Sequence, residues 1–402
     1  MFLNPNPGPD GKKPAPNPDL PPLNPEIREW FEARQKRLKP VRTTQTPSGQ
    51  TLDWVPIESQ VPGGKIATPP PPFSVPADEK VSPIRFELDA PNVERGPAGT
   101  VPILRKNLVA LHYTTSLQQY LSKRGGLRVN AKRTKSPADP NPKGFFHGIS
   151  GQSINVSGCS TWLDVWDPYL QTSEDHSIMQ CGLQNYDRPQ LQSLEAGWTV
   201  DHSLNGDWLP HLFTYYTTNG YTKDGDNLGG YNSDVDGWVQ VSSSIYPGSA
   251  MSPYSTQGGA QMGFSIRYLL DYDENNWWFW VQGGGQGQWI GYYPCWLFFG
   301  GPGESLFSTL GAVAEWVGFW GEVYSALSDP TKSTTQMGSG RKAEAGWTHA
   351  CFQKNLLIQP AGKNTLQNQN GSASAEDPKK YDIKTFMNSG TPWGSYFYAG
   401  GS

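Results

Sequence analysis

The sequence predicts an all-β fold, a sandwich of two antiparallel β-sheets, preceded by a mostly extended N-terminal region with one or two short helices. Of the 402 residues, 45 are Gly and 36 are Pro, which interrupt long helices, and 12% are aromatic. After Gly144, strand-like segments recur about every 10–15 residues. Short aromatic strands separated by Gly and Pro turns are typical of sandwiches and barrels.

The predicted strands of this C-terminal part show a two-residue alternation or a run of aromatic side chains. Two aromatic runs around a glycine-rich turn, between Asn276 and Pro294, predict a hairpin. Leu306–Glu315 has the pattern of a helix. The strands are predicted at Gln152–Ser157, Thr161–Trp166, Leu191–Val200, His211–Thr217, Trp238–Ser243, Gly263–Leu270, Trp277–Gln282, Trp289–Tyr293 and Gly394–Tyr398.

The N-terminal region has too little apolar periodicity for a core of its own, so we expect it to fold against the larger part. Pro25–Leu38 predicts a helix, because Pro starts it and apolar residues follow at helical spacing. Thr114–Lys123 predicts a second, shorter helix. The other segments are extended: a hairpin at residues 43–58, a polyproline II run, PPPPF, within residues 66–82, and a strand at residues 99–106.

Composition predicts four segments along the chain. Residues 1–25 form a disordered tail rich in Pro and Asn, and residues 26–127 form an N-terminal domain. Residues 128–143, rich in Lys, Arg and Pro, form a linker that we expect to be cleavable, and residues 144–402 form the β-sandwich domain.

Charge is divided unequally along the chain. Residues 1–142 contain 20 Lys and Arg against 13 Asp and Glu, a net +7, and residues 143–402 contain 12 against 23, a net −11, which sum to −4. The two parts can therefore attract each other. The basic residues are scattered and interrupted by Pro, which argues against nucleic-acid binding. No apolar run reaches the ~18 residues of a membrane span, and the start lacks a signal-peptide core.

The four cysteines all lie in the acidic part, at Cys159, Cys181, Cys295 and Cys351. An even number is compatible with two disulfides and a secreted protein, with three pairings open, and buried free thiols are the alternative. Because there is no CxxC pair, a zinc cluster is not expected, and the sequence predicts no metal and no cofactor.

Two glutamates lie on strands with a distinct face. In Leu191–Asp201, alternate residues from Gln192 to Val200 form an apolar face, so Glu195 points the other way. In Val317–Ser325, Glu322 shares one face with Gly318, Trp320 and Tyr324. The plain alternative is that both are solvated surface carboxylates, which is the common situation for Glu.

Other hydrolytic chemistries lack their motifs. The chain has no GxSxG, no HExxH, no Asp-Thr-Gly or Asp-Ser-Gly loop and no phosphate-binding glycine loop. Two carboxyls can hydrolyse a peptide bond when one is ionised and activates water while the other is protonated and polarises the carbonyl, which requires acidic conditions. The same pair could act on a glycosidic bond, so a glycoside hydrolase stays open, as does a non-catalytic carbohydrate-binding sandwich.

Several segments resemble the neprosin family of glutamic peptidases. SLEAGWTV (193–200) is similar to that family's SIEAGWQV-type motif. Further similar segments follow in the same order: LFTYYTTNGY (212–221), NWWFWV (276–281), IGYYPCWLF (290–298), GEV (321–323), STTQMGSG (333–340) and YFYAGG (396–401). Upstream, GTVPILRK resembles the end of the family's activation peptide, and TWLDVWDP (161–168) its first catalytic strand.

The resemblance implies an acid-activated endopeptidase made as a zymogen, with an activation (pro) domain at residues 26–127 and a concave active-site cleft. Carried over by motif, its two catalytic glutamates are Glu195 and Glu322. We assign Glu195 as base and Glu322 as acid, although a coupled pair can exchange these roles. Trp198, Tyr215, Tyr292, Trp320 and Tyr324 are predicted to bind substrate, with a preference for proline before the cut bond.

The chain departs from the plant members of the family at two places. Phe319-Trp320-Gly321 replaces their Trp-Gly-Gly, and Gly96 replaces the Cys that starts their activation-peptide motif. Subsite shape and disulfide pattern are therefore left open. The expected partners are protein or peptide substrates, including proline-rich ones, and the chain's own pro-domain as an inhibitor, in a secreted monomer.

Overall fold

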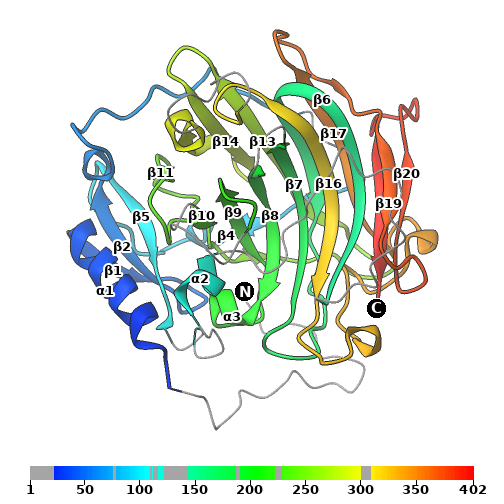
Figure 1. Cartoon of the computed structure of the whole chain (residues 1–402), viewed down its shortest axis with the longest axis horizontal. Coiled ribbons are helices and arrows are strands. Elements are labelled where there is room, and N and C mark those ends of the chain that lie inside the picture. Colours follow the sequence, from blue (N-terminus) through cyan, green and yellow to red (C-terminus); the bar gives the residue numbers. More distant parts are fainter. Residues whose placement is uncertain are drawn as a thin grey trace.

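The computed structural model is an all-β structure with few helices (Figure 1). It describes residues 22–75, 78–108, 111, 116–121, 144–186, 191–221, 229–299 and 309–402. The predicted tail up to residue 21 and the predicted linker at 128–143 lie outside these residues. Within them, no helix has the length and hydropathy needed to cross a bilayer.

Most strands join one large curled sheet that closes over itself into two layers. Its main path is β10-β9-β8-β7-β16-β6-β13-β14-β15-β11, paired antiparallel throughout. The strands on this path are β6 (Phe145–Asp164), β7 (His176–Asn185), β8 (Gln192–Asp201), β9 (His211–Thr217), β10 (Gly229–Tyr231), β11 (Val239–Gln240), β13 (Met262–Asp271), β14 (Asn276–Gln282), β15 (Gln288–Pro294) and β16 (Ala314–Tyr324).

The long strand β6 connects the two layers. Its first half pairs with β16 and β19 (Ser372–Ala375), and its second half pairs with β13 and β17 (Cys351–Pro360). β17 continues that second layer to β21 (Tyr396–Gly401) and β20 (Tyr381–Phe386), and β18 (Gln367–Asn368) pairs with β17. In Figure 1, β19 and β20 lie at the edge of the molecule opposite the N-terminal strands.

The core lies between the two layers. Leu194 and Trp198 of β8 are fully buried on the inner face of the first layer, as the alternation in the sequence predicts. Aromatic residues on the inner face of the second layer pack against them. Tyrosine hydroxyls also join the two layers: Tyr268 Oη donates to the Glu195 carbonyl at 3.1 Å, and Tyr293 Oη donates to Thr214 Oγ1 at 3.0 Å. The side chains that alternate with these point to the two outer faces.

The N-terminal region folds against this body, as expected. Its own sheet has the order β1-β2-β5, formed by β1 (Arg42–Gln45), β2 (Thr51–Pro56) and β5 (Thr100–Arg105). Two short strands join the body: β3 (Ser82–Pro83) pairs with β13, and β4 (Arg85–Phe86) pairs with β12 (Met251–Ser252). The helices are α1 (Pro25–Leu38), α2 (Leu117–Leu121) and, in the body, α3 (His202–Asn205).

Helix α1 begins and ends as the sequence predicts. Asn24 caps it by accepting from the Glu26 amide, Pro25 occupies its first position, and Lys39 ends it in the left-handed conformation. Ile27 and Phe31 of α1 and Leu117 and Leu121 of α2 enter the main hydrophobic core.

Three sequence predictions need correction. The two strands predicted at Gln152–Ser157 and Thr161–Trp166 belong to the single strand β6. The described part of the predicted helix Leu306–Glu315 is a turn that leads into β16, because from Ala314 onward the backbone pairs with β6 and β7. All four cysteines are buried free thiols rather than disulfides, with Cys159 Sγ and Cys181 Sγ 3.8 Å apart.

Candidate catalytic site

The two glutamates lie on strands that flank β7 and point to the same face of the first layer. In the pairing register, Glu195 of β8 lies opposite Gly182, and Glu322 of β16 lies opposite Ile178. Gly182 and Ile178 have the same parity on β7, so both carboxylates stand on the outer face, away from the core. Both are fully buried.

The indole of Trp320 connects the two carboxylates. Its Nε1 donates to Glu322 Oε2 at 3.3 Å. Its far edge lies over Gly182, where an added Cβ would come within 2.5 Å of Trp320 Cη2 and 3.2 Å of Glu195 Cγ. The two carboxyl groups therefore lie at opposite ends of one indole ring, a spacing that a single bound peptide can bridge.

Gly182→Ala is expected to lower kcat/KM for peptide hydrolysis by about 10–100-fold and the free energy of unfolding by about 1–3 kcal/mol, because the new methyl group must displace the buried side chain of Trp320 or Glu195. Steady-state kinetics and thermal unfolding measure the two effects. Gly285→Ala is the matched control, since a Cβ there meets nothing within 4 Å. Unchanged kinetics in Gly182→Ala would contradict the role given to this contact.

Glu322 is surrounded by donors. Gln180 Nε2 donates to its Oε2 at 2.8 Å, and His176 Nε2 lies 3.1 Å from its Oε1. His147 Nε2 lies 3.5 Å from Oε2, a distance for charge interaction without hydrogen-bond geometry, while His147 Nδ1 lies 2.9 Å from Glu376 Oε2. Burial lowers the pKa of His147, but Glu376 and Glu322 outweigh it and raise that pKa to about 10. A protonated His147 thus favours the ionised form of Glu322.

His147→Gln is expected to lower the free energy of unfolding most at low pH. Because the folded-state pKa of about 10 exceeds the unfolded value, the stabilisation is complete below about pH 6.5 and is lost as pH rises toward 10. The difference, up to about 5 kcal/mol, is measurable by urea unfolding across pH in a Glu195→Gln background, which limits self-digestion. The exposed His349→Gln is the control, and a pH-independent difference for His147→Gln would show a neutral His147.

Within the described ranges, Glu195 accepts hydrogen bonds from two hydroxyl groups. Ser193 Oγ donates to Glu195 Oε1 at 2.9 Å, and Tyr221 Oη donates to the same oxygen. Burial and the neighbouring Glu195 raise the pKa of Tyr221 well above its usual value, so the phenol keeps its proton and acts as a donor. The described hydrogen-bond donors of Glu195 are thus neutral hydroxyls, whereas two histidines lie close to Glu322.

The N-terminal region reaches this site through α2. Tyr215 of β9 lies directly opposite Glu195, and its hydroxyl donates to the carbonyl of Leu121 at 3.0 Å. Leu121 is itself buried, and an added Cβ at Gly230 of β10 would lie 3.3 Å from its Cδ2. Part of the cover over Glu195 therefore comes from the N-terminal region.

The structure places three of the five predicted substrate-binding residues at this face and moves two away from it. Tyr215 and Trp320 lie beside the glutamates, and Tyr324 lies with its ring centre 5.6 Å from that of His176. The prediction for Trp198 is wrong, because the side chain is in the core and its Nε1 donates to the Asp164 carbonyl at 2.8 Å. Tyr292 lies away from the glutamates, because it stands on the outer face of the second layer.

Sequence reasoning did not identify the side chains that contact the carboxylates. They lie on β6, β7 and β8 and in the turn that follows β9, and β7 was not predicted as a strand. A partial signal existed in the EAGW segment, where Ser193 stands two residues before Glu195 on the same face. The missed residues are His147, His176, Gln180, Ser193 and Tyr221, together with Trp316, which packs against Trp320 on the same face.

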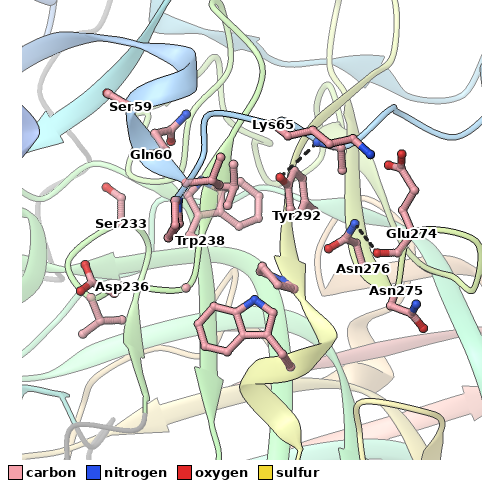
Figure 2. A pocket seen from close by; sticks show the side chains of 18 of the residues that line it. Ser59, Gln60, Lys65, Ser233, Asp236, Trp238, Glu274, Asn275, Asn276 and Tyr292 are labelled. Atoms are coloured by element: carbon pink, nitrogen blue, oxygen red, sulfur yellow. Dashed lines mark hydrogen bonds between the residues drawn. The ribbon is translucent and has the colours of Figure 1, made fainter.

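The large cavity shown in Figure 2 is separate from the glutamates. Its volume is about 1330 Å³, and it lies where the N-terminal region meets β11, β15 and the turn after β15. Figure 2 shows Trp238 and Tyr292 facing it, with Glu274 on one side and Asp236 on the other. Neither glutamate lines it. Across the described ranges, no group of three or more His, Cys, Asp or Glu side chains is arranged to hold a metal ion.

Comparison with known proteins agrees with the carboxylate chemistry of this site. The neprosin family model matches residues 173–402, more than half of the chain, so the chain belongs to the neprosin family. This membership supports a peptidase of the glutamic type.

Two solved structures are similar to the chain at low identity. The crystal structure of scytalido-glutamic peptidase with a peptide-based transition-state analogue has 9% identity and a TM-score of 0.31, covering 64% of this chain and 97% of that one. SCP-B, a member of the Eqolisin family of peptidases in complex with the tripeptide Ala-Ile-His, has 8% identity and a TM-score of 0.30, covering 64% and 98%.

Proposed function

We propose that the chain is the zymogen of an acid-activated glutamic endopeptidase in which Glu195 and Glu322 are the catalytic residues. The observation that carries the proposal is the pair itself: two strand-borne carboxyl groups on one face, connected by one indole and held in different environments. Different environments let one carboxyl be ionised while its neighbour keeps a proton, which is the requirement for general acid–base hydrolysis.

The donors around the two groups favour roles opposite to those assigned from the sequence. Glu322, with Gln180, Trp320 and two histidines about it, is suited to remain ionised and to take a proton from the attacking water. Glu195, whose described donors are the neutral hydroxyls of Ser193 and Tyr221, is suited to carry a proton and to donate a hydrogen bond to the scissile carbonyl. Water oxygen then bonds to the carbonyl carbon. The proton held by Glu322 passes to the nitrogen, and the C–N bond breaks as the C=O bond re-forms.

The N-terminal region is proposed to act as an intramolecular inhibitor. Both carboxylates are fully buried. The carbonyl of Leu121 accepts a hydrogen bond from the hydroxyl of Tyr215, which lies opposite Glu195. The N-terminal region that carries Leu121 must therefore leave before substrate can reach the glutamates. Cations of the N-terminal region pair with carboxylates of the body near β10: Lys106 Nζ lies 3.2 Å from Asp234 Oδ2, and Arg37 Nη2 lies 3.0 Å from Asp236 Oδ1. Among the described residues, the charge division seen in the sequence thus acts near β10.

Acidification is proposed to weaken these ion pairs and to expose the linker at residues 128–143 for cleavage. A preference for proline before the cut bond is proposed from Trp320, because a proline ring stacks well on an indole face. A peptide library cut without enrichment of proline before the cut bond would remove this preference. Secretion and a monomeric state remain predictions from the sequence.

The test is digestion of an unfolded protein and of polysaccharides side by side, at pH 4 and pH 7, by the full chain, with mass spectrometry of the chain itself. The expected result is protein hydrolysis at pH 4 only, with loss of the N-terminal region. Hydrolysis of polysaccharide without proteolysis would overturn the proposal in favour of a glycosidase. Failure to digest either substrate after removal of the N-terminal region would favour a non-catalytic sandwich.

A further inference from the structure

A proline-rich segment of the N-terminal region crosses the outer face of the second layer. We call residues 66–75, IATPPPPFSV, the proline strap. Below it lies an aromatic floor of four side chains on β14 and β15: Trp278, Trp280, Trp289 and Tyr292. Ile66, Ala67, Phe73 and Val75 of the strap pack on this floor, whose side chains are at most 8% exposed.

The strap is bound by both ring contacts and hydrogen bonds. The ring of Phe73 meets that of Trp280 edge-on, with centroids 4.8 Å apart, and the Arg267 guanidinium lies 4.2 Å above Phe73. Trp289 Nε1 donates to the carbonyl of Pro71 at 3.2 Å, and Tyr292 Oη accepts from the Ala67 amide at 3.3 Å. Indole rings with N–H groups directed at proline carbonyls are the means by which aromatic grooves recognise polyproline segments.

The floor offers more donors than the strap uses. Trp278 Nε1 and Trp280 Nε1 are buried and have no hydrogen-bond partner among the residues that the structure describes. An indole N–H can only donate, and leaving it buried without an acceptor is costly. The strap places no carbonyl group against either indole N–H, whereas an extended segment bound in a different register could accept a hydrogen bond from both.

We propose that the aromatic floor is a docking site for proline-rich, extended segments of protein substrates, and that the proline strap occupies it until the N-terminal region is removed. The proposal rests on the proposed zymogen processing for the exposure of the floor. Trp278 and Trp280 alternate on β14 with the core residues Trp277 and Phe279, so the floor lies across the core from Glu195. Docking there would hold one part of a long substrate on the protein and raise the local concentration of the rest at the glutamates on the opposite face.

The cavity of Figure 2 extends this site. Ala67 and Lys65 line it at one end of the strap, and Tyr292 belongs to both the floor and the cavity. A docked segment longer than the strap can continue into the cavity, where Trp296 is 63% exposed and available for a further ring contact.

The experiment measures binding of a fluorescent peptide with the strap sequence, IATPPPPFSV, to the full chain at neutral pH by anisotropy. A strap variant carries Pro69→Gly, Pro70→Ser, Pro71→Gly, Pro72→Ser and Phe73→Gly, which leaves the floor uncovered. We expect the peptide to bind the strap variant at least ten-fold more tightly than the unmodified chain. The strap peptide should bind the strap variant at least five-fold more tightly than the peptide IATAAAAFSV does. Adding Trp289→Phe to the strap variant should weaken binding of the strap peptide several-fold.

Equal binding of the two peptides, or no binding by a strap variant with native near-UV circular dichroism, would overturn the proposal. If the strap variant does not fold, Phe73→Ala replaces it, with Phe386→Ala as control, since Phe386 is another half-buried Phe stacked on an aromatic ring, Tyr396 at 4.7 Å. Peptide binding that does not differ between these two would also overturn it. The assay needs no hydrolysis, so absence of peptidase activity would reject only the proposed function.

Discussion

Glu322→Gln is expected to lower kcat/KM for peptide hydrolysis at acidic pH by at least about 10³-fold, whereas Glu195→Gln should retain more activity. The difference follows from what a glutamine side chain can do. An amide cannot take a proton from water, so it cannot replace an ionised Glu322. It can still donate a hydrogen bond, so it replaces part of the function of a protonated Glu195.

The comparison is made on the acid-treated full chain by steady-state hydrolysis of an unfolded protein substrate between pH 3 and pH 7. Glu315→Gln, at the start of the same strand β16, is the control for a Glu-to-Gln change. The larger loss in Glu195→Gln would restore the roles assigned from the sequence, and full activity in both variants would reject the pair.

The positions of both glutamates followed from strand alternation, because that pattern depends only on neighbouring residues. Leu194 and Trp198 are buried in the core, and Glu195 between them points the other way, as the alternation predicts. On β16, Glu322 and Trp320 likewise share the outer face. The helix α1 was predictable for a similar local reason, a proline at its start and apolar residues at helical spacing.

The surroundings of the glutamates were not predictable, because they depend on which strands pair. All ten residues of β7 are buried, so this strand shows no alternation of polar and apolar residues and was missed. Its register with β16 brings Gln180 to Glu322, across a long sequence separation. Tyr292 and Trp198 were misplaced because an aromatic side chain in a strand looks the same in sequence whether it faces a cleft, the core or the opposite sheet.

Asp234→Asn is expected to destabilise the contact between the N-terminal region and the body by about 3–5 kcal/mol, because it leaves a buried cation without its partner. Lys106 and Asp234 are only 4% and 6% exposed, and Lys106 Nζ also donates to the Leu204 carbonyl at 2.6 Å. Burial lowers the pKa of Lys106, and Asp234 opposes that shift. Tyr120 of α2 donates to the same carboxylate, so the change affects α2 as well.

Thermal unfolding and mass spectrometry of the chain after incubation at a series of pH values measure the consequence. If the N-terminal region is the inhibitor, Asp234→Asn should lower the unfolding temperature and move loss of that region toward neutral pH. Asp236→Asn is the matched control, because its carboxylate is 71% exposed and its pairs with Arg34 and Arg37 are screened by solvent, so about 0–1 kcal/mol is expected. If both variants shift the pH of processing equally, the pH response depends on net charge and not on the buried pair. If Asp234→Asn lowers the unfolding temperature but leaves the pH of processing unchanged, the buried pair stabilises the chain without controlling its activation.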